Sequence, residues 1–139
     1  MQIRNIDENK YQAYLDSIEY ADFLQSVEQS NKLKSNGWQV EYLQFVENDV
    51  VKASAMIGII PLMKVFKYCY VPRGFIMDYH DKDLVSSVAK VFKEYLYSKG
   101  IVYAEMDPAI QLQQRNQDGD IVEGGFNNFD VVENLKSSG

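Results

Sequence analysis

The sequence is poor in the residues that build disulfides and metal centres. Its 139 residues include one cysteine, Cys69, and one histidine, His80. No disulfide can form within the chain, which suits a reducing cytosol, and a zinc or iron site would need carboxylates at a spacing that the sequence does not offer. Cys69 lies in an apolar, strand-like run, where we expect a buried, inert thiol rather than a nucleophile. We expect His80, beside a helix start, to be a turn residue rather than a catalytic acid or base.

Positive charge and long hydrophobic runs are also scarce. There are 14 Lys and Arg residues against 20 Asp and Glu residues, for a net charge of −6 and a pI of about 4.7. This balance argues against nucleic-acid or acidic-lipid binding over the whole surface, although it allows a local basic patch. The apolar run ASAMIGIIPLM is too short to span a membrane, and the first ten residues lack the apolar stretch of a signal peptide. We therefore expect one cytoplasmic domain over residues 1–139, with many of its ten Tyr and seven Phe residues in the core.

Hydrophobic periodicity and turn residues predict an α+β domain, in which helices flank a mostly antiparallel sheet. The predicted helices cover residues 8–18, 26–37, 81–100 and 128–139. The predicted strands cover residues 38–48, 50–63, 64–71, 75–79 and 101–108. A short extended link at 22–26, a tight turn at 47–49 and an irregular segment at 108–128 complete the chain. Since a final helix of this kind is usually followed by another strand, we expect the chain to be a fragment of a longer protein.

Basic side chains at two places are candidates for anion binding. The stretch YVPRGFIMDY, residues 70–79, has the pattern of two short strands with Arg73 at the turn between them. Arg73 is either a solvated turn residue or a group presented to an anion. Lys32 and Lys34, at the end of the second predicted helix, either complement the helix dipole or contact a phosphate.

A coenzyme A site is not predicted. The stretch QRNQDGD, residues 114–120, is faintly similar to the pyrophosphate loop of acetyltransferases, Gln/Arg-x-x-Gly-x-Gly/Ala, but position 118 is Asp where the loop needs Gly. The stretch also does not connect a strand to the start of a helix, the arrangement in which backbone amides bind a phosphate. This weighs against a stand-alone acetyltransferase that depends on coenzyme A.

Several segments in order resemble the N-terminal part of the Fem family, the FemABX and MurM-like aminoacyltransferases. The first is FLQSVEQSNKLKSNGW, with the family's Phe-x-Gln-Ser/Thr segment, short helix and Gly-Trp. The second is YCYVPRGFIMDYHDKDLVSSVAKVFKEYLYSKGIVYAEMDP, with a Tyr-x-Pro-Arg-Gly turn, a long helix and a strand ending in Asp-Pro. The resemblance covers residues 20–108. Phe75, where the family usually has Pro, and Gln29, where it usually has an aromatic residue, depart from the pattern.

The resemblance implies a function for a longer parent protein. Fem-type enzymes transfer an amino acid from aminoacyl-tRNA to an amino group on the stem peptide of a peptidoglycan precursor, which is UDP-linked or lipid-linked. They use no metal and no coenzyme A, and their fold has two acetyltransferase-like domains with the precursor between them. The chain resembles most of the first domain, so we expect it to contribute to precursor binding and to be inactive alone. Aminoacyl-tRNA would bind the missing part, and the precursor would place the parent near the inner face of the membrane. The alternative is a binding domain with this fold and no catalysis.

The resemblance also implies site residues. Lys34 matches a lysine that holds the precursor's phosphates, with Lys32 possible because of a one-residue difference in length. Tyr103 matches a tyrosine that contacts the precursor. Arg73 occupies the basic position of the turn, where a guanidinium suits a phosphate. No catalytic residue is predicted within this chain.

Overall fold

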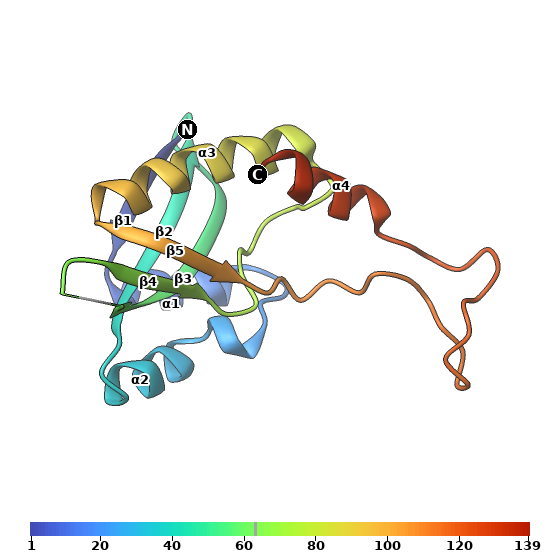
Figure 1. The fold of residues 1–139 in the computed structure, drawn as a ribbon, viewed down its shortest axis with the longest axis horizontal. Helices are drawn as coiled ribbons and strands as arrows, with labels where there is room; N and C mark the ends of the chain where they lie inside the picture. Colours follow the sequence, from blue (N-terminus) through green and yellow to red (C-terminus); the bar gives the residue numbers. More distant parts are fainter. Residues whose placement is uncertain (63) are drawn as a thin grey trace.

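One five-stranded sheet organises the chain, with its strands in the sequence order β1-β2-β3-β4-β5 (Figure 1). The structure is a computed structural model that describes residues 1–62 and 64–139. The strands are β1 Gln2–Ile6, β2 Gln39–Glu47, β3 Val50–Pro61, β4 Lys67–Val71 and β5 Ile101–Met106. The helical elements are α1 Glu8–Ser17, the 3-10 turn η1 Phe23–Gln25, α2 Val27–Ser35, α3 Lys82–Ser98 and α4 Phe129–Ser137. Neighbouring strands are antiparallel except β4 and β5, which are parallel. The predicted α+β class is therefore confirmed.

The local sequence explains the central hairpin and the long helix. Asn48 and Asp49 connect β2 to β3 with φ values of 49° and 62°, a conformation that these two residue types tolerate better than most others. The carboxylate of Asp81 caps α3 by accepting a hydrogen bond from the backbone N–H of Leu84 at 2.9 Å. Because parallel strands cannot be joined by a tight turn, α3 also serves as the crossover from β4 to β5.

Helices cover the two faces of the sheet unequally. α3 packs on one face over a core cluster that includes Phe45, Phe75 and Phe92, whose rings meet edge to face with centroids 5.0 to 6.2 Å apart. On the other face α1 and α2 cover β2 and β3, where the Tyr11 and Tyr42 rings stack at 4.7 Å. On this second face the side chains of β4 and β5 are partly or largely exposed. That surface is available for binding.

Two predictions of local structure were wrong, and one strand was missed. Residues 75–79 are not a strand: only Ile76 makes an isolated bridge, to Ser54, because Phe75 turns into the core under α3. The link at 22–26 is not extended but contains the 3-10 turn η1, capped by Asp22. Residues 2–6 form the edge strand β1, whose mainly polar sequence and exposure gave no apolar run to detect. Residue 63, at the end of the predicted strand 50–63, lies outside the described residues.

The segment between β5 and α4 stands away from the body of the domain (Figure 1). We call residues 111–128 the arm. Two isolated bridges, Gln113 to Asn127 and Arg115 to Ile121, are the pairings described within it, in agreement with the predicted irregular structure. After the arm, α4 returns to pack against α3, and Asn134 donates hydrogen bonds from its side chain to the carbonyls of Tyr79 and His80.

Candidate functional site

A buried glutamine joins two of the segments singled out in the sequence. The Gln25 side chain is fully buried, and its Nε2 donates to the carbonyl of Pro72 at 2.5 Å and to that of Met56 at 3.1 Å. Its Oε1 accepts from the backbone N–H of Met56 at 2.7 Å and from the hydroxyl of Tyr11 at 3.1 Å. A Cβ at Gly74 would lie 2.9 Å from Nε2, so the turn needs glycine there. Gln25 thereby fixes the backbone at Pro72, directly before Arg73, and packs closely against Gly74.

An aspartate at the end of β5 holds the same turn from the other side. Asp107 Oδ1 accepts from the backbone N–H of Arg73 at 2.9 Å and from the hydroxyl of Tyr70 at 3.1 Å. Arg73 has a φ of 49°, an uncommon conformation for a non-glycine residue, which these contacts maintain. Its Nε lies 3.9 Å from Asp107 Oδ2, and its side chain is 45% exposed. The guanidinium is therefore only loosely paired.

Exposed and partly buried aromatic side chains lie together on the sheet beside this turn. Tyr103, on β5, is 57% exposed, and its ring stacks on that of Tyr68, on β4, with centroids 5.7 Å apart and planes at 17°. The Trp38 ring meets Tyr68 edge to face at 6.0 Å. The Tyr68 hydroxyl donates to Glu105, and burial, followed by this bond, raises the pKa of Tyr68 to about 12. We call Trp38, Tyr68 and Tyr103 the aromatic row; its flat rings are suited to stacking against a ligand.

Lys34 lies at the end of α2 and is already paired. Its Nζ is 2.5 Å from Glu8 Oε2, donates to the Tyr42 hydroxyl at 3.1 Å and lies 5.3 Å from the centre of the Tyr42 ring. The pKa of Lys34 is raised mainly by its hydrogen bond to Glu8, and the same bond lowers the pKa of Glu8. The ammonium is thus held charged. Lys32, the alternative phosphate contact, is exposed in the same last turn of α2.

The three predicted binding residues lie around one part of the molecule but are not in contact. Tyr103 and Arg73 lie on the β4–β5 side. Positions 103, 105 and 107 share one face of the sheet, and Asp107 bonds both Tyr70 and the backbone of Arg73. Lys34 lies against β2 on the same face of the sheet. Gly58 of β3 pairs with Tyr70 of β4, and a Cβ added at Gly58 would contact Leu33 of α2, so α2 covers the face on which Tyr70 lies. No hydrogen bond or ion pair within residues 1–62 and 64–139 links Lys34 to the other two.

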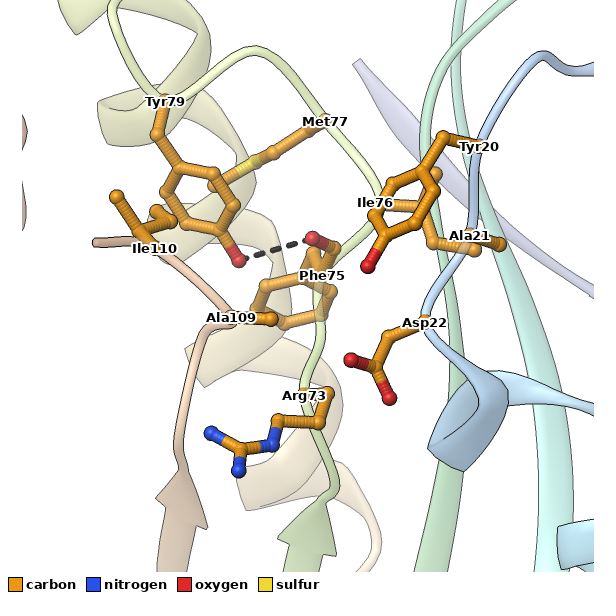
Figure 2. A pocket seen from close by; sticks show the side chains of 10 residues that line it. All are labelled: Tyr20, Ala21, Asp22, Arg73, Phe75, Ile76, Met77, Tyr79, Ala109 and Ile110. Carbon is orange, nitrogen blue, oxygen red and sulfur yellow. Dashed lines mark hydrogen bonds between the residues drawn. The ribbon is translucent and has the colours of Figure 1, made fainter.

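A cavity of about 190 Å³ opens next to Arg73, beyond the ends of β4 and β5 (Figure 2). The chain before η1 supplies Tyr20 and Asp22, and the chain after β5 supplies Ile110. The remaining lining residues follow the turn: Phe75, Ile76, Met77 and Tyr79, with Ala21 and Ala109 at the sides. In Figure 2 the Asp22 carboxylate faces this space, whereas the Arg73 guanidinium extends away from Asp22.

Sequence reasoning missed Gln25, Asp107 and Asp22 as site residues. Gln25 and Asp107 stood inside the quoted Phe-x-Gln-Ser and Asp-Pro segments, so the signal was present, but their role depends on contacts 47 and 34 residues along the chain. For Asp22 the sequence offered only a residue type that commonly caps helices, and nothing that marked it as a binding residue. These long-range contacts have no counterpart in periodicity or spacing.

The lone cysteine and histidine behave as the sequence indicates. Cys69 is buried, and burial raises the pKa of its thiol to about 12, which leaves almost no thiolate at neutral pH. His80 is an exposed turn residue whose Nδ1 lies 2.5 Å from Asp130 Oδ2. Among the described residues, no group of three or more His, Cys, Asp or Glu side chains is placed to hold a metal ion. No helix in the same part of the chain has the length and apolarity to cross a membrane.

Comparison with known proteins decides the family. The FemAB family profile matches residues 6–139. The chain belongs to the FemAB family. Aminoacyltransferase FemA of Staphylococcus aureus (strain bovine RF122 / ET3-1) is 30% identical over 138 residues, which are 97% of this chain and 33% of that protein. The chain therefore spans about a third of the length of the curated FemAB relatives it matches.

A solved structure has the same fold. The crystal structure of FemX superposes with a TM-score of 0.73 at 22% identity, over 99% of this chain and 31% of FemX. An aminoglycoside acetyltransferase from an uncultured soil metagenomic sample gives a TM-score of 0.48 at 9% identity, a likeness too low to carry an argument. The resemblance to the Fem family that the sequence showed is thereby confirmed.

Proposed function

We propose that residues 1–139 form one domain that binds the peptidoglycan precursor within a longer FemAB aminoacyltransferase. The parent would attach an amino acid from aminoacyl-tRNA to an amino group of the precursor's stem peptide, in the cytoplasm and near the inner face of the membrane. The observation that carries the proposal is the exposed Tyr103 ring, stacked on Tyr68 on β4–β5, with Arg73 at the turn after β4 and Lys34 on the same side of the sheet. The precursor joins a uracil and sugars to phosphates, and rings and cations on one face of a sheet suit such a ligand.

Each predicted residue has a distinct role in this proposal. Tyr103 offers its ring face to the uracil or a sugar, and its stacking on Tyr68 holds that ring in place. Arg73 and Lys34 contact anionic groups of the precursor, Arg73 from a fixed turn and Lys34 by exchanging its contact with Glu8. Neither of these steps is catalytic, and the groups that complete transfer would come from the rest of the parent. We expect no transferase activity from the 139-residue chain alone.

The experiment is a calorimetric titration of the chain with UDP-MurNAc-pentapeptide. Tyr103→Ala should weaken binding roughly two- to tenfold, the equivalent of about 0.5–1.5 kcal/mol for one aromatic contact. Tyr97→Ala is the matched control, because Tyr97 is 88% exposed on α3, which covers the opposite face of the sheet. Lys34→Ala and Arg73→Ala should also weaken binding, with Lys90→Ala on α3 as their control. Equal affinities for all variants, each shown to be folded, would contradict the proposed site.

A non-catalytic binding domain is the second candidate. The exposed side chains of β4 and β5 suit binding whether or not chemistry follows. Purified full-length parent, supplied with aminoacyl-tRNA and the precursor, separates the two. Transfer of the amino acid supports the enzyme, and saturable binding without transfer supports the binding domain.

A further inference from the structure

The cavity beside Arg73 has two chemically different parts. Its floor is apolar, formed by Phe75, Met77 and Ile110 (Figure 2). Opposite Ile110 stands Asp22, whose Oδ1 accepts from the backbone N–H of Leu24 at 2.9 Å. The hydrogen bonds found within residues 1–62 and 64–139 leave Asp22 Oδ2 for a ligand.

The local charge favours a cation inside the cavity. The charged side chains that line the cavity are Asp22 and Arg73, and Asp107, which lies beside Arg73 outside the lining, brings the net charge of the three to −1. Arg73 already lies 3.9 Å from Asp107 and extends away from Asp22, so it does not neutralise the carboxylate that faces the cavity. An anion entering the cavity would meet Asp22 directly, whereas an ammonium group would be attracted to it.

The size of the cavity limits the ligand. Its volume of about 190 Å³ is below the range of about 300–1,000 Å³ that is usual for whole small molecules. A short aliphatic chain fits such a space, and its methylene groups suit the Phe75, Met77 and Ile110 floor. A whole nucleotide is too large for it.

We propose that this cavity binds the aliphatic side chain of a primary amine, with the ammonium group on Asp22. The inference rests on the proposed function, because it gives the acceptor amino group of the stem peptide a place within this domain. Such an amine has a pKa of about 10.4 in water and enters as the cation at neutral pH. The Tyr20 hydroxyl, which points toward Asp22 in Figure 2, is a second partner for the ammonium.

The test is an NMR titration of the 139-residue chain with Nα-acetyl-lysine methylamide. Saturable shifts of the backbone amides of Ala21, Ile76 and Ala109 are expected at millimolar concentrations. The same probe acetylated at Nε keeps the aliphatic chain and loses the charge, and its affinity should be at least fivefold lower. Equal affinities for the two probes would overturn the proposal. Stronger shifts at these amides with N-acetylalanine would also overturn it, because a carboxylate would bind Arg73 rather than Asp22.

Asp22→Asn is the decisive variant. Asparagine still caps η1 through its side-chain oxygen, so the fold is retained while the charge is removed. Affinity for the lysine probe should fall at least fivefold, whereas Asp16→Asn, on the exposed surface of α1, should leave it unchanged. Ile110→Trp, which fills the cavity, should abolish the shifts without touching a charge. Unchanged binding in Asp22→Asn or in Ile110→Trp, with the fold verified by circular dichroism, would place the amine elsewhere.

The two proposals fail in different ways. If the lysine probe does not bind while Tyr103→Ala still weakens binding of UDP-MurNAc-pentapeptide, the amine site is wrong and the precursor site stands. If the probe binds Asp22 and the precursor does not bind, the cavity is an amine site and the proposed function is wrong.

Discussion

The two cationic residues of the candidate site are held in opposite ways. Arg73 is positioned through its backbone: buried Gln25 fixes Pro72, and Asp107 accepts the N–H of Arg73, while the guanidinium itself is only loosely paired. Lys34 is positioned through its side chain, by Glu8 and Tyr42 at a half-exposed surface. One cation is therefore presented by a rigid turn and can move its tip, and the other is held at its tip and must exchange partners to bind.

The largest effect should come from breaking the buried support of the Arg73 turn. Gln25→Ala leaves the Met56 N–H and the Pro72 carbonyl without their partner, and each unpaired buried group costs about 1–3 kcal/mol. We expect the free energy of unfolding to fall by roughly 3–5 kcal/mol, measured by urea denaturation. Gln12→Ala, which removes a glutamine bound to Asp16 on the surface, should change it by less than about 0.5 kcal/mol. Similar values for both variants would show that Gln25 does not support the turn.

A smaller effect should follow from removing the second support. Asp107→Ala removes the acceptor of the Arg73 N–H and of the Tyr70 hydroxyl, at a cost of about 1–2 kcal/mol for two partly exposed hydrogen bonds. Asp107→Asn keeps an acceptor oxygen and should retain most of the stability. In the precursor titration, Asp107→Ala should weaken binding in the wild type and have little further effect in Arg73→Ala. Additive losses in the double variant would show that Asp107 does not act through Arg73.

On the Lys34 side, removing the partner should improve binding. Glu8→Gln releases the ammonium from a half-exposed ion pair, which is worth about 0.2–1 kcal/mol. The affinity for UDP-MurNAc-pentapeptide should therefore rise about 1.4- to fivefold by calorimetry. Glu28→Gln, an exposed acid in the first turn of α2, is the control and should have no effect. A weaker affinity in Glu8→Gln would mean that Glu8 orients Lys34 rather than competing for it.

The smallest effect concerns an exposed pair outside the site. The hydrogen bond between the His80 ring and the Asp130 carboxylate is the main reason that the pKa of His80 is raised and that of Asp130 is lowered. Asp78 also faces His80 and accepts its backbone N–H. Since the folded-state pKa of His80 is raised, its stabilisation is fully present below about pH 6.5 and is lost as the pH rises through the raised value. The difference in Tm between wild type and His80→Gln should shrink between pH 6 and 9, and a constant difference would contradict this.

Much of the fold could be predicted from the sequence, because its elements depend on local patterns. The apolar stripe and Asp81 cap of α3, and the turn residues between β2 and β3, mark these elements without knowledge of the rest. The prediction of a strand at residues 75–79 failed because their apolar side chains do not form a strand; Phe75 is instead buried in the core under α3. The conformation of this segment is set by the burial of Phe75 and not by strand propensity.

The candidate site was less predictable for a related reason. The basic and aromatic residues Lys34, Arg73 and Tyr103 carry visible chemistry, so the resemblance to the Fem family could single them out, and their roles stay predictions. Gln25 carries no distinctive chemistry in a sequence, and its four hydrogen bonds arise only when α1, β3 and the turn meet. Polar residues that act by joining distant segments are the ones that local reasoning misses.

The arm has a practical consequence for handling the protein. Arg115 is its single basic residue, in a segment that stands off the body of the domain and exposes Leu112, Ile121 and Phe126. A brief exposure to trypsin should therefore cut the chain after Arg115 before it cuts within the sheet. The two pieces would remain associated through the packing of α4 on α3 and the side-chain bonds of Asn134, and would separate only under denaturing conditions.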